Sequence, residues 1–390
     1  MSRIQTRDRQ RHQSPRSQRG SLTSLSQEII GNIYQALTGN AHIPRHFLQR
    51  AFANGLPAQE LQQAVSLAKS MRALPDYLLA ASEQKFERAV YWDELGLKSR
   101  SGELFLESTL WAIYAEMLIE DEDKRTLVYK KYRESYRCAA PHFNHPAEEI
   151  TISYIASSLS GYLRTPNSEA ELAPEKLPVV VLLNGLFSAR EELHFLENSL
   201  LSQGFATLSL DYPGVSLHTA QVPSAFDVKE LGNAIYLFLS GRSEIDCNRV
   251  TLYGLSLGGR IALYMALTNP ERFHSIVCMS TPLDLLNDID RLAAIYAREY
   301  FISPIAARTA LYELAMHTQI EDRLEYLEAP LLVLGGGKDK IALPDETKII
   351  FDRSQSSDKK LILCPGAGHC LHEMMPSLRY EVAQWIKQRA

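Results

Sequence analysis

The chain has 390 residues, of which 45% are hydrophobic and 22% charged, as in an ordinary soluble globular protein. The formal net charge is −5; six arginines and one aspartate give residues 1–20 a charge of +5, which leaves −10 for the remainder. A mildly acidic body disfavours nucleic acid as a partner. No apolar run approaches the ~20 residues of a membrane span, so we predict no membrane partner.

Residues 1–24 form a basic segment that we predict to be a disordered tail, because it is rich in arginine and serine and poor in apolar residues. The segment also lacks the apolar stretch of a secretory signal. The chain has five cysteines, an odd number whose spacing fits no disulfide framework. The number and spacing of the cysteines therefore indicate reduced thiols and a cytoplasmic location.

Residues 25–145 are predicted to form an all-helical cap domain. Apolar residues recur at helical spacing in several stretches, among them 29–37, 103–119 and 123–138. Prolines and glycines separate these stretches, as expected between helices. No repeat of fixed length is visible.

Residues 146–390 show a different pattern, in which short apolar runs alternate with helical stretches. An alternating strand is predicted at 150–154, and 170–178 is predicted to be a hairpin loop or connector. Runs typical of buried strands follow at 179–183, 206–210, 250–253, 275–279, 331–334 and 361–364. Helices are predicted at 189–202, 226–240, 260–268 and 378–387. This alternation predicts an α/β domain with a mostly parallel sheet and helices on both faces.

One interval in this domain is too long for a simple crossover between strands. About 50 residues, mostly helical in pattern, separate Ser280 from Pro330. Long insertions in compact folds are usually functional. We therefore predict a helical lid at about 281–329, above the carboxyl ends of the strands.

The strongest motif is Gly254-Leu255-Ser256-Leu257-Gly258-Gly259, which follows a predicted strand and opens a predicted helix. A nucleophilic serine on such a sharp turn needs small residues two positions before and after it, here Gly254 and Gly258. The turn exposes the hydroxyl and directs the following helix N-terminus at the site. The motif predicts Ser256 as a catalytic nucleophile.

A serine hydroxyl needs a general base, and in folds of this type the acid and then the histidine follow the serine in the chain. Asp339 lies just past the run 331–334, and His369 just past the run 361–364. Both positions are strand ends, where catalytic groups of open α/β sheets collect. The alternatives to Asp339 are Asp345 and Glu346, which fit the first turn of the next helix instead. His372 is the alternative base, with a surface or supporting role preferred for it.

Acyl transfer also requires donors for the developing oxyanion. The backbone N–H of Leu257, directly after the nucleophile, is one predicted donor. The second is assigned to the loop after the run 179–183, where Gly185 lets the backbone turn and the N–H of Leu186 face the site. The predicted oxyanion hole is therefore Leu257 with Leu186.

These residues resemble a branch of the α/β-hydrolase superfamily that includes the fermentation–respiration switch protein and 2,6-dihydroxypseudooxynicotine hydrolase. The resemblance is most specific at 184–192, at 211–214, at the turn around Ser256 and at 368–372. It implies an α/β-hydrolase core behind a helical domain that covers the active site. Glu191 and Glu192 match an acidic pair of that branch, and we interpret them as complementing a helix dipole.

The function predicted from the motifs and this resemblance is a serine hydrolase that cleaves a carbonyl substrate. The resemblance implies an ester, a thioester or the carbon–carbon bond of a 1,3-diketone-like compound. The alternatives are an acyltransferase with the same acyl-enzyme and a non-catalytic regulatory binding protein on the same scaffold.

We expect a small acyl or aromatic ketone or ester substrate and no cofactor. The run Cys138, His142 and His145 lacks a second ligand cluster, so no metal is predicted. The predicted lid contains an apolar stretch, which favours an acyl or aromatic substrate. The residues of this stretch are Leu285, Leu286, Leu292, Ile295 and Tyr296. The oligomeric state stays open, with a homodimer as one option.

Overall fold

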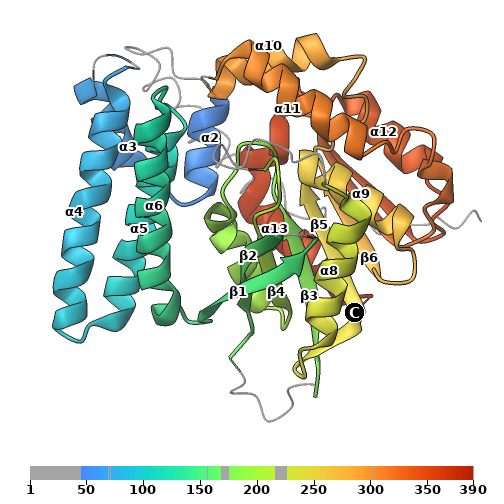
Figure 1. Cartoon of the computed structure of the whole chain (residues 1–390), viewed down its shortest axis with the longest axis horizontal. Helices are drawn as coiled ribbons and strands as arrows, with labels where there is room; N and C mark the ends of the chain where they lie inside the picture. The colour runs from blue at the N-terminus through green and yellow to red at the C-terminus, as the bar shows by residue number, and fades with distance from the viewer. Residues whose placement is uncertain are drawn as a thin grey trace, which may run out of the picture.

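A helical domain and an α/β domain lie side by side in the computed structural model (Figure 1). The model describes residues 45–68, 70, 72–155, 157–167, 175–215, 226–300 and 302–389. The predicted tail, the predicted helix at 29–37 and most of the connector at 170–178 lie outside the described residues.

The helical domain is built from five described helices and a short 3-10 turn. These are α2 (Arg45–Ala53), α3 (Ala58–Ala68), α4 (Leu74–Glu94), α5 (Lys98–Glu116), α6 (Glu122–Ala139) and η1 (Ala140–His142). Helix α5 is buried along most of its length because α4 and α6 pack against it. Asp121 caps α6 by accepting the Lys124 N–H at 2.7 Å, which satisfies one unpaired donor of the first turn.

The α/β domain contains one eight-stranded sheet in the order β1-β2-β4-β3-β5-β6-β7-β8. Its strands are β1 (Ala147–Tyr154), β2 (Ser157–Arg164), β3 (Leu177–Leu183), β4 (Ala206–Leu210), β5 (Ile245–Leu255), β6 (Ser275–Met279), β7 (Leu331–Gly336) and β8 (Lys359–Cys364). Strands β3 to β8 are mutually parallel, whereas β2 pairs antiparallel with both β1 and β4. The mostly parallel sheet is confirmed, and β2 is a strand that the sequence pattern did not predict.

Helices cover both faces of this sheet. Alternate residues of the central strands pack on α8 (Val228–Ser240), α9 (Leu257–Thr268) and α12 (Pro344–Arg353) on one face. The strand residues that point to the opposite face pack on α7 (His194–Leu201) and α13 (Met375–Lys387). Strands buried on both faces are nearly continuous apolar runs, which is why their sequence signal is strong.

The predicted lid region contains α10 (Ile289–Tyr300) and α11 (Pro304–His317), which lie above the sheet in orange in Figure 1. Most of the apolar residues that favoured an acyl or aromatic substrate do not border a cavity at the site. Leu285, Leu292 and Tyr296 are buried in the main hydrophobic core, and Leu286 is exposed. Ile295 is the member of this apolar stretch that borders a cavity at the site.

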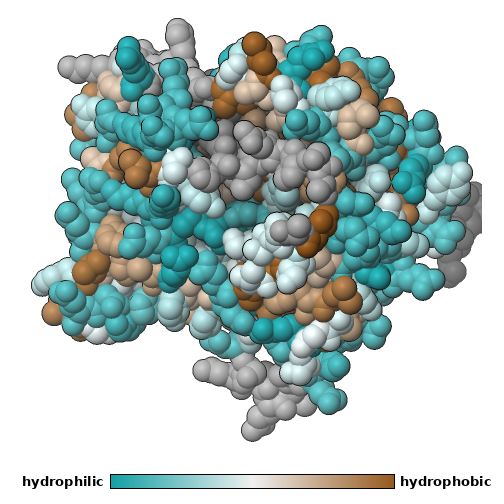
Figure 2. Space-filling model, viewed as in Figure 1, coloured by the Kyte–Doolittle hydropathy of each residue, from teal (hydrophilic) through white to brown (hydrophobic). Residues whose placement is uncertain are grey.

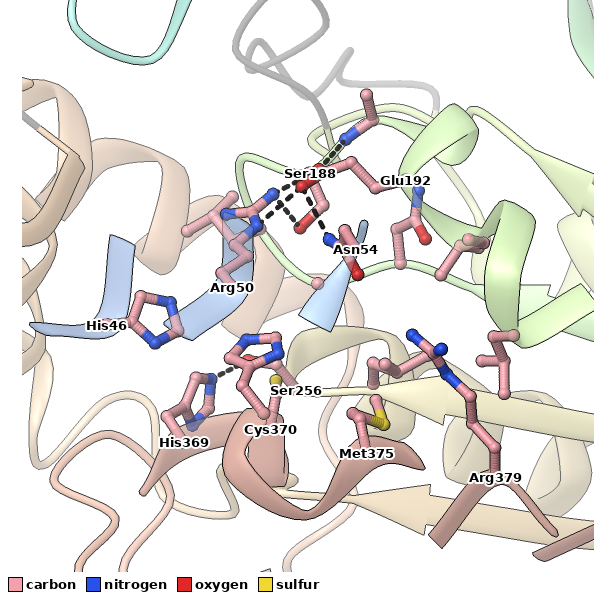
Figure 3. Close-up of a pocket in the computed structure, with 18 residues that line it drawn as sticks. His46, Arg50, Asn54, Ser188, Glu192, Ser256, His369, Cys370, Met375 and Arg379 are labelled. Carbon is pink, nitrogen blue, oxygen red and sulfur yellow. Dashed lines mark hydrogen bonds and ion pairs between the residues drawn. The ribbon is translucent and has the colours of Figure 1, made fainter. Parts of the chain in front are cut away.

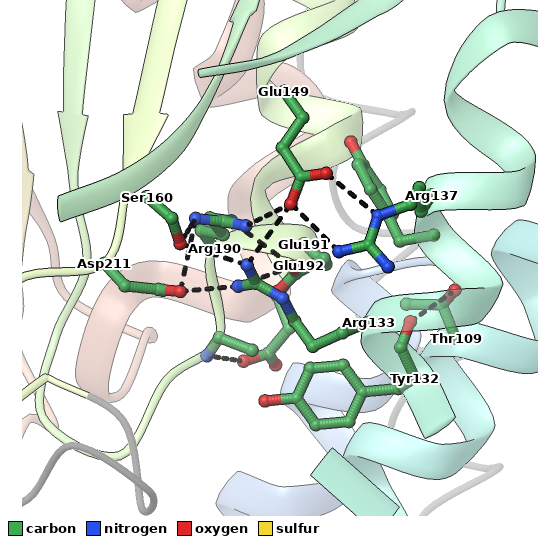
Figure 4. A network of polar contacts seen from close by, with 12 residues as sticks. Thr109, Tyr132, Arg133, Arg137, Glu149, Ser160, Arg190, Glu191, Glu192 and Asp211 are labelled. Atoms are coloured by element: carbon green, nitrogen blue, oxygen red, sulfur yellow. Dashed lines mark hydrogen bonds and ion pairs between the residues drawn. The ribbon is translucent and has the colours of Figure 1, made fainter. Parts of the chain in front are cut away.

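Charged residues join the two domains (Figure 4). Arg133 of α6 lies 2.6 Å from Asp211, which follows β4, and 3.2 Å from Glu191. Arg190 lies 3.3 Å from Glu191 and 3.4 Å from Asp211, beneath the same helix. The members of this network come from both domains, so it fixes α6 on the edge of the sheet.

The acidic pair Glu191 and Glu192 lies in the short 3-10 helix η2 (Arg190–Leu193). Glu192 does cap this turn, because its Oε2 accepts the Ala189 N–H at 3.0 Å. Both carboxylates are also buried in ion pairs with arginines, a role that the dipole interpretation missed. Burial explains the pairing, since an unpaired buried carboxylate is costly.

Figure 2 shows a mostly hydrophilic face over the helical domain and the helices α8 and α9, with hydrophobic residues scattered among polar ones. None of the helices in the described part of the chain has both the length and the apolar character to span a bilayer.

Candidate active site

Ser256 occupies a sharp turn between β5 and α9. Its backbone has φ 54° and ψ −121°, a region that non-glycine residues rarely enter and that costs about 1–3 kcal/mol. The Ser256 N–H donates to the Met279 carbonyl at 2.7 Å, which ties the turn to β6. A Cβ on Gly254 would lie 2.2 Å from the Gly258 carbonyl oxygen, and one on Gly258 would lie 2.0 Å from the Leu183 carbonyl oxygen. The two glycines therefore make this turn possible.

His369 lies between Ser256 and Asp339. Its Nε2 is 2.8 Å from Ser256 Oγ, and its Nδ1 is 2.9 and 3.0 Å from the two oxygens of Asp339. The backbone N–H groups of Ile341 and Ala342 donate to Asp339 Oδ1 at 2.8 and 3.0 Å, which fixes the carboxylate. In this geometry the imidazole can take the proton of the serine hydroxyl.

The loops that hold these two residues are joined to each other and to β6. The Lys338 N–H donates to the Ala367 carbonyl at 2.9 Å. The Cys370 N–H, one residue after His369, donates to Ser280 Oγ at 2.9 Å. The relative position of acid and histidine is therefore set by main-chain contacts at the strand ends.

The pKa of His369 reflects two opposing effects. Burial is the largest single effect, and it disfavours the charged imidazolium and lowers the pKa. The charge and hydrogen bond of the Asp339 carboxylate, together with those of Cys370, outweigh burial and hold the pKa well above its ordinary value. The nearby His46 and His372 have pKa values well below the ordinary range, chiefly because both are buried. At neutral pH these two rings are neutral.

The predicted oxyanion residues lie on two chain segments next to Ser256. Leu257 is the first residue of α9, so its N–H has no partner within the helix. Gly185 lies directly against the nucleophile, since a Cβ there would be 2.9 Å from Ser256 Cβ. Leu186 follows in the same loop and borders the cavity at Ser256, and Phe187 has a φ of 58°.

Helix α2 of the helical domain forms a roof over this site (Figure 3). Arg50 donates to both oxygens of Glu192, at 2.9 and 2.5 Å, and to Ser188 Oγ at 3.0 Å. Asn54 donates to Glu192 at 3.1 Å. One turn before Arg50, the His46 ring lies 5.8 Å from the His369 ring. The resemblance implied a helical domain over the site, but no motif indicated which residues form this roof, because they meet the site only through tertiary contacts.

Two cavities meet at His46 and His369. The smaller one, about 50 Å³, borders Ser256, the loop 184–189 and α2. The larger one, about 320 Å³, lies on the side of the lid helix α10, and its lining includes Arg298, Lys338 and Lys340. The site thus has a small compartment beside the nucleophile and a wider one lined by three basic residues and Glu373.

The alternatives to Asp339 and His369 do not join the contact that runs from Ser256 through His369 to Asp339. Asp345 is exposed and pairs with Lys348 in the first turn of α12. Glu346 accepts from the N–H groups of Leu283, Asp284 and Leu343 and so ties the lid segment to α12. His372 is buried and borders the small cavity, so the prediction of a surface position was wrong and that of a supporting one stays open.

Two other histidines, His194 and His218, lie near predicted strand ends in the sequence and are therefore candidates to line the pocket. His194 is buried against Phe143, Tyr136 and Arg164, away from the cavities at Ser256. His218 lies outside the described residues.

Comparison with known proteins agrees with this architecture. Residues 178–301 match the family described as alpha/beta hydrolase fold, and residues 282–374 match the serine aminopeptidase S33 family. The curated 2,6-dihydropseudooxynicotine hydrolase of Paenarthrobacter nicotinovorans is 28% identical over 308 residues, which are 78% of this chain and 80% of that protein. Esterase FrsA of Yersinia pestis is 22% identical over 65% of this chain, and the match spans only 62% of the esterase.

A solved structure shows the same fold. The crystal structure of the 2,6-dihydroxy-pseudo-oxynicotine hydrolase matches 87% of this chain and 95% of its own with a TM-score of 0.74, at 23% identity. The chain therefore has the α/β-hydrolase fold, and homologues named a hydrolase and an esterase place it among hydrolytic enzymes. Within that class it is similar to the pseudooxynicotine hydrolase and the FrsA esterases, which confirms the predicted resemblance.

Proposed function

We propose that this hydrolase cleaves an ester, a thioester or an activated carbon–carbon bond at a carbonyl carbon through an acyl-enzyme on Ser256. His369 removes the Ser256 proton as the hydroxyl attacks and then returns it to the leaving group. Asp339 holds the imidazole with its Nδ1–H directed at the carboxylate and stabilises the imidazolium. The N–H groups of Leu257 and Leu186 are the proposed donors to the oxyanion.

The proposal rests on one observation, the unbroken contact from Ser256 Oγ to His369 and on to Asp339 at 2.8 and 2.9 Å. A non-catalytic binding protein has no need for a strained serine in contact with a buried acid–histidine pair. The names of the relatives, a hydrolase and an esterase, also support a hydrolytic reaction. Acyl transfer to an alcohol or amine shares the first half-reaction, so analysis of products with competing nucleophiles distinguishes it from hydrolysis.

The test is labelling by a fluorophosphonate probe and turnover of an ester, a thioester and a 1,3-diketone panel. We expect the wild type to be labelled and the Ser256→Ala variant to lose both labelling and about 10⁶-fold in turnover. A Ser199→Ala variant, which changes a helix serine away from the triad, serves as the matched control. Equal labelling of the wild type and Ser256→Ala would contradict the proposal.

We also propose a cytoplasmic location. The five cysteines are all free, which suits a reducing compartment.

A further inference from the structure

The small cavity beside Ser256 is bordered by polar groups that have no partner among the described residues. Both side-chain polar atoms of Asn184, Nδ1 of His372 and Nε of Arg379 are buried without a hydrogen bond. All three residues line the cavity that Ser256 borders. Asn184 and His372 are 1% and 8% exposed.

Such groups are expensive to leave unsatisfied. In the free enzyme, water in a polar cavity can satisfy them. A substrate that displaces the water must supply polar groups in its place. The N–H groups of Asn184 and Arg379 need acceptor oxygens, whereas Asn184 Oδ1 needs a donor or a retained water. The cavity is therefore suited to a polar acyl group, and an aliphatic acyl group is disfavoured there.

The charges around the cavity favour an anion. Arg50 is neutralised by its bidentate contact with Glu192. Arg379 donates one hydrogen bond to the Ala53 carbonyl at 2.6 Å, and no carboxylate in the described part of the chain pairs with it. Its guanidinium points from α13 toward the space that Ser256 borders (Figure 3). The lining thus carries one positive charge that is not compensated.

The size of the cavity limits the group that fits. A volume of about 50 Å³ corresponds to about three to five water-sized spaces. This space suits a chain of two or three carbons with a carboxylate better than an aromatic or long acyl group.

We propose that the small cavity binds the acyl part of the substrate as a short chain ending in a carboxylate, such as a malonyl or succinyl group. Arg379 and the Asn184 amide donate to the carboxylate, while the acyl carbonyl faces Ser256. This inference rests on the proposed function, since it assigns the acyl side of the same site. The leaving group then lies on the side of the larger cavity.

The test compares two esters of equal shape, monoethyl succinate and ethyl 4-methylpentanoate, in which two methyl groups replace the carboxylate oxygens. We expect the wild type to prefer the succinate by about 100-fold or more in kcat/KM. Arg379→Gln and Asn184→Leu should each lower this preference at least tenfold. Because both esters are measured on one sample, a loss of folded protein cancels in the ratio.

Arg298→Gln is the matched control, because it removes a cation from the larger cavity instead. We expect it to leave the preference unchanged. A preference that falls in Arg298→Gln and not in Arg379→Gln would place the carboxylate in the larger cavity and overturn the inference. A wild type that favours the neutral ester, or treats both equally, would overturn it as well, although the proposed function would stand. If neither ester is cleaved, the inference fails, and probe labelling of Ser256 shows separately whether the proposed function fails with it.

Discussion

The floor and the roof of this site are built in different ways. The floor consists of loops at the carboxyl ends of the strands, and main-chain contacts fix Ser256, Asp339 and His369 there. The roof is helix α2, which is held over the floor by the side chains of Arg50 and Asn54. In the proposed mechanism the floor performs the chemistry, whereas the roof covers the site and can vary without changing the reaction. Four substitutions test this comparison.

The largest effect is expected on the floor, at Asp339→Asn. The variant should lose about 10⁴-fold in kcat, because the amide favours the wrong imidazole tautomer. His369 must be neutral to act as a base, so wild-type activity falls as the pH drops through its raised pKa. Without the carboxylate, burial dominates and the residual activity should extend to lower pH. A pH–rate profile measures both changes.

The control for this variant is Asp345→Asn, since Asp345 is an exposed residue of α12 paired with Lys348. It should keep the wild-type rate and profile. An unchanged acid limb in Asp339→Asn would contradict the assignment of Asp339.

A smaller effect is expected from Gly185→Ala. The added Cβ would lie 2.9 Å from Ser256 Cβ and 3.2 Å from the Leu255 carbonyl oxygen, so the oxyanion loop must shift. We expect kcat to fall about 10²-fold with little change in KM, because the lost donor acts in the transition state. Gly241→Ala, where a Cβ meets nothing closer than 3.4 Å, should be close to the wild type. A change confined to KM would place Gly185 in ground-state binding instead.

Arg50→Met tests the roof. Removing Arg50 leaves Glu192 buried and unpaired, so the free energy of unfolding should fall by about 3 kcal/mol or more. The change in kcat should stay within about tenfold, because no reacting group is lost. Denaturant unfolding and steady-state kinetics measure the two effects. The double variant Arg50→Met/Glu192→Met should recover most of the stability, and a loss of kcat as large as that of Asp339→Asn would place the roof in the chemistry.

The smallest effect on activity is expected at Glu116, in the helical domain. Burial raises the pKa of this carboxyl from 4.5 to about 8. The unfolded chain loses this proton above pH 4.5 and the folded chain keeps it, so stability is highest below pH 4.5 and declines until pH 8. The free energy of unfolding should fall by roughly 3 kcal/mol between pH 4.5 and pH 7, because each of these 2.5 pH units contributes about 1.36 kcal/mol.

Glu116→Gln should remove this decline and leave kcat unchanged. Unfolding by denaturant at pH 5, 6, 7 and 8 gives the slope, with the exposed Glu120→Gln as the control. The same slope in wild type and Glu116→Gln would show that Glu116 is not the group responsible.

Most of the α/β domain could be predicted from the sequence because its central strands are buried on both faces. The apolar runs at 206–210 and 275–279 coincide with β4 and β6. Strand β2 escaped prediction because its first residues are polar and exposed, and because Gly161 weakens a strand pattern. The structure gives the reason for that glycine: a Cβ there would lie 2.6 Å from the Ser209 carbonyl oxygen on β4.

The floor of the site could also be predicted, since each of its residues follows a strand end and belongs to a local motif. The contacts that hold the roof could not, because Arg50 and Glu192 are 142 positions apart and no local pattern links them. Glu192 was noticed as part of an acidic pair, but its partner depends on how the two domains pack. A buried arginine in another domain leaves no local signal in the sequence.

The position of His369 between the two cavities has a consequence for the sequence of events in one turnover. If the acyl part lies in the smaller cavity and the leaving group in the wider one, the leaving group departs first and opens a side from which water can reach the acyl carbon near His369. The acid product, held under α2, then leaves last. The enzyme would thus release its products in a fixed order, and the acid rather than the alcohol should act as a competitive inhibitor against the substrate.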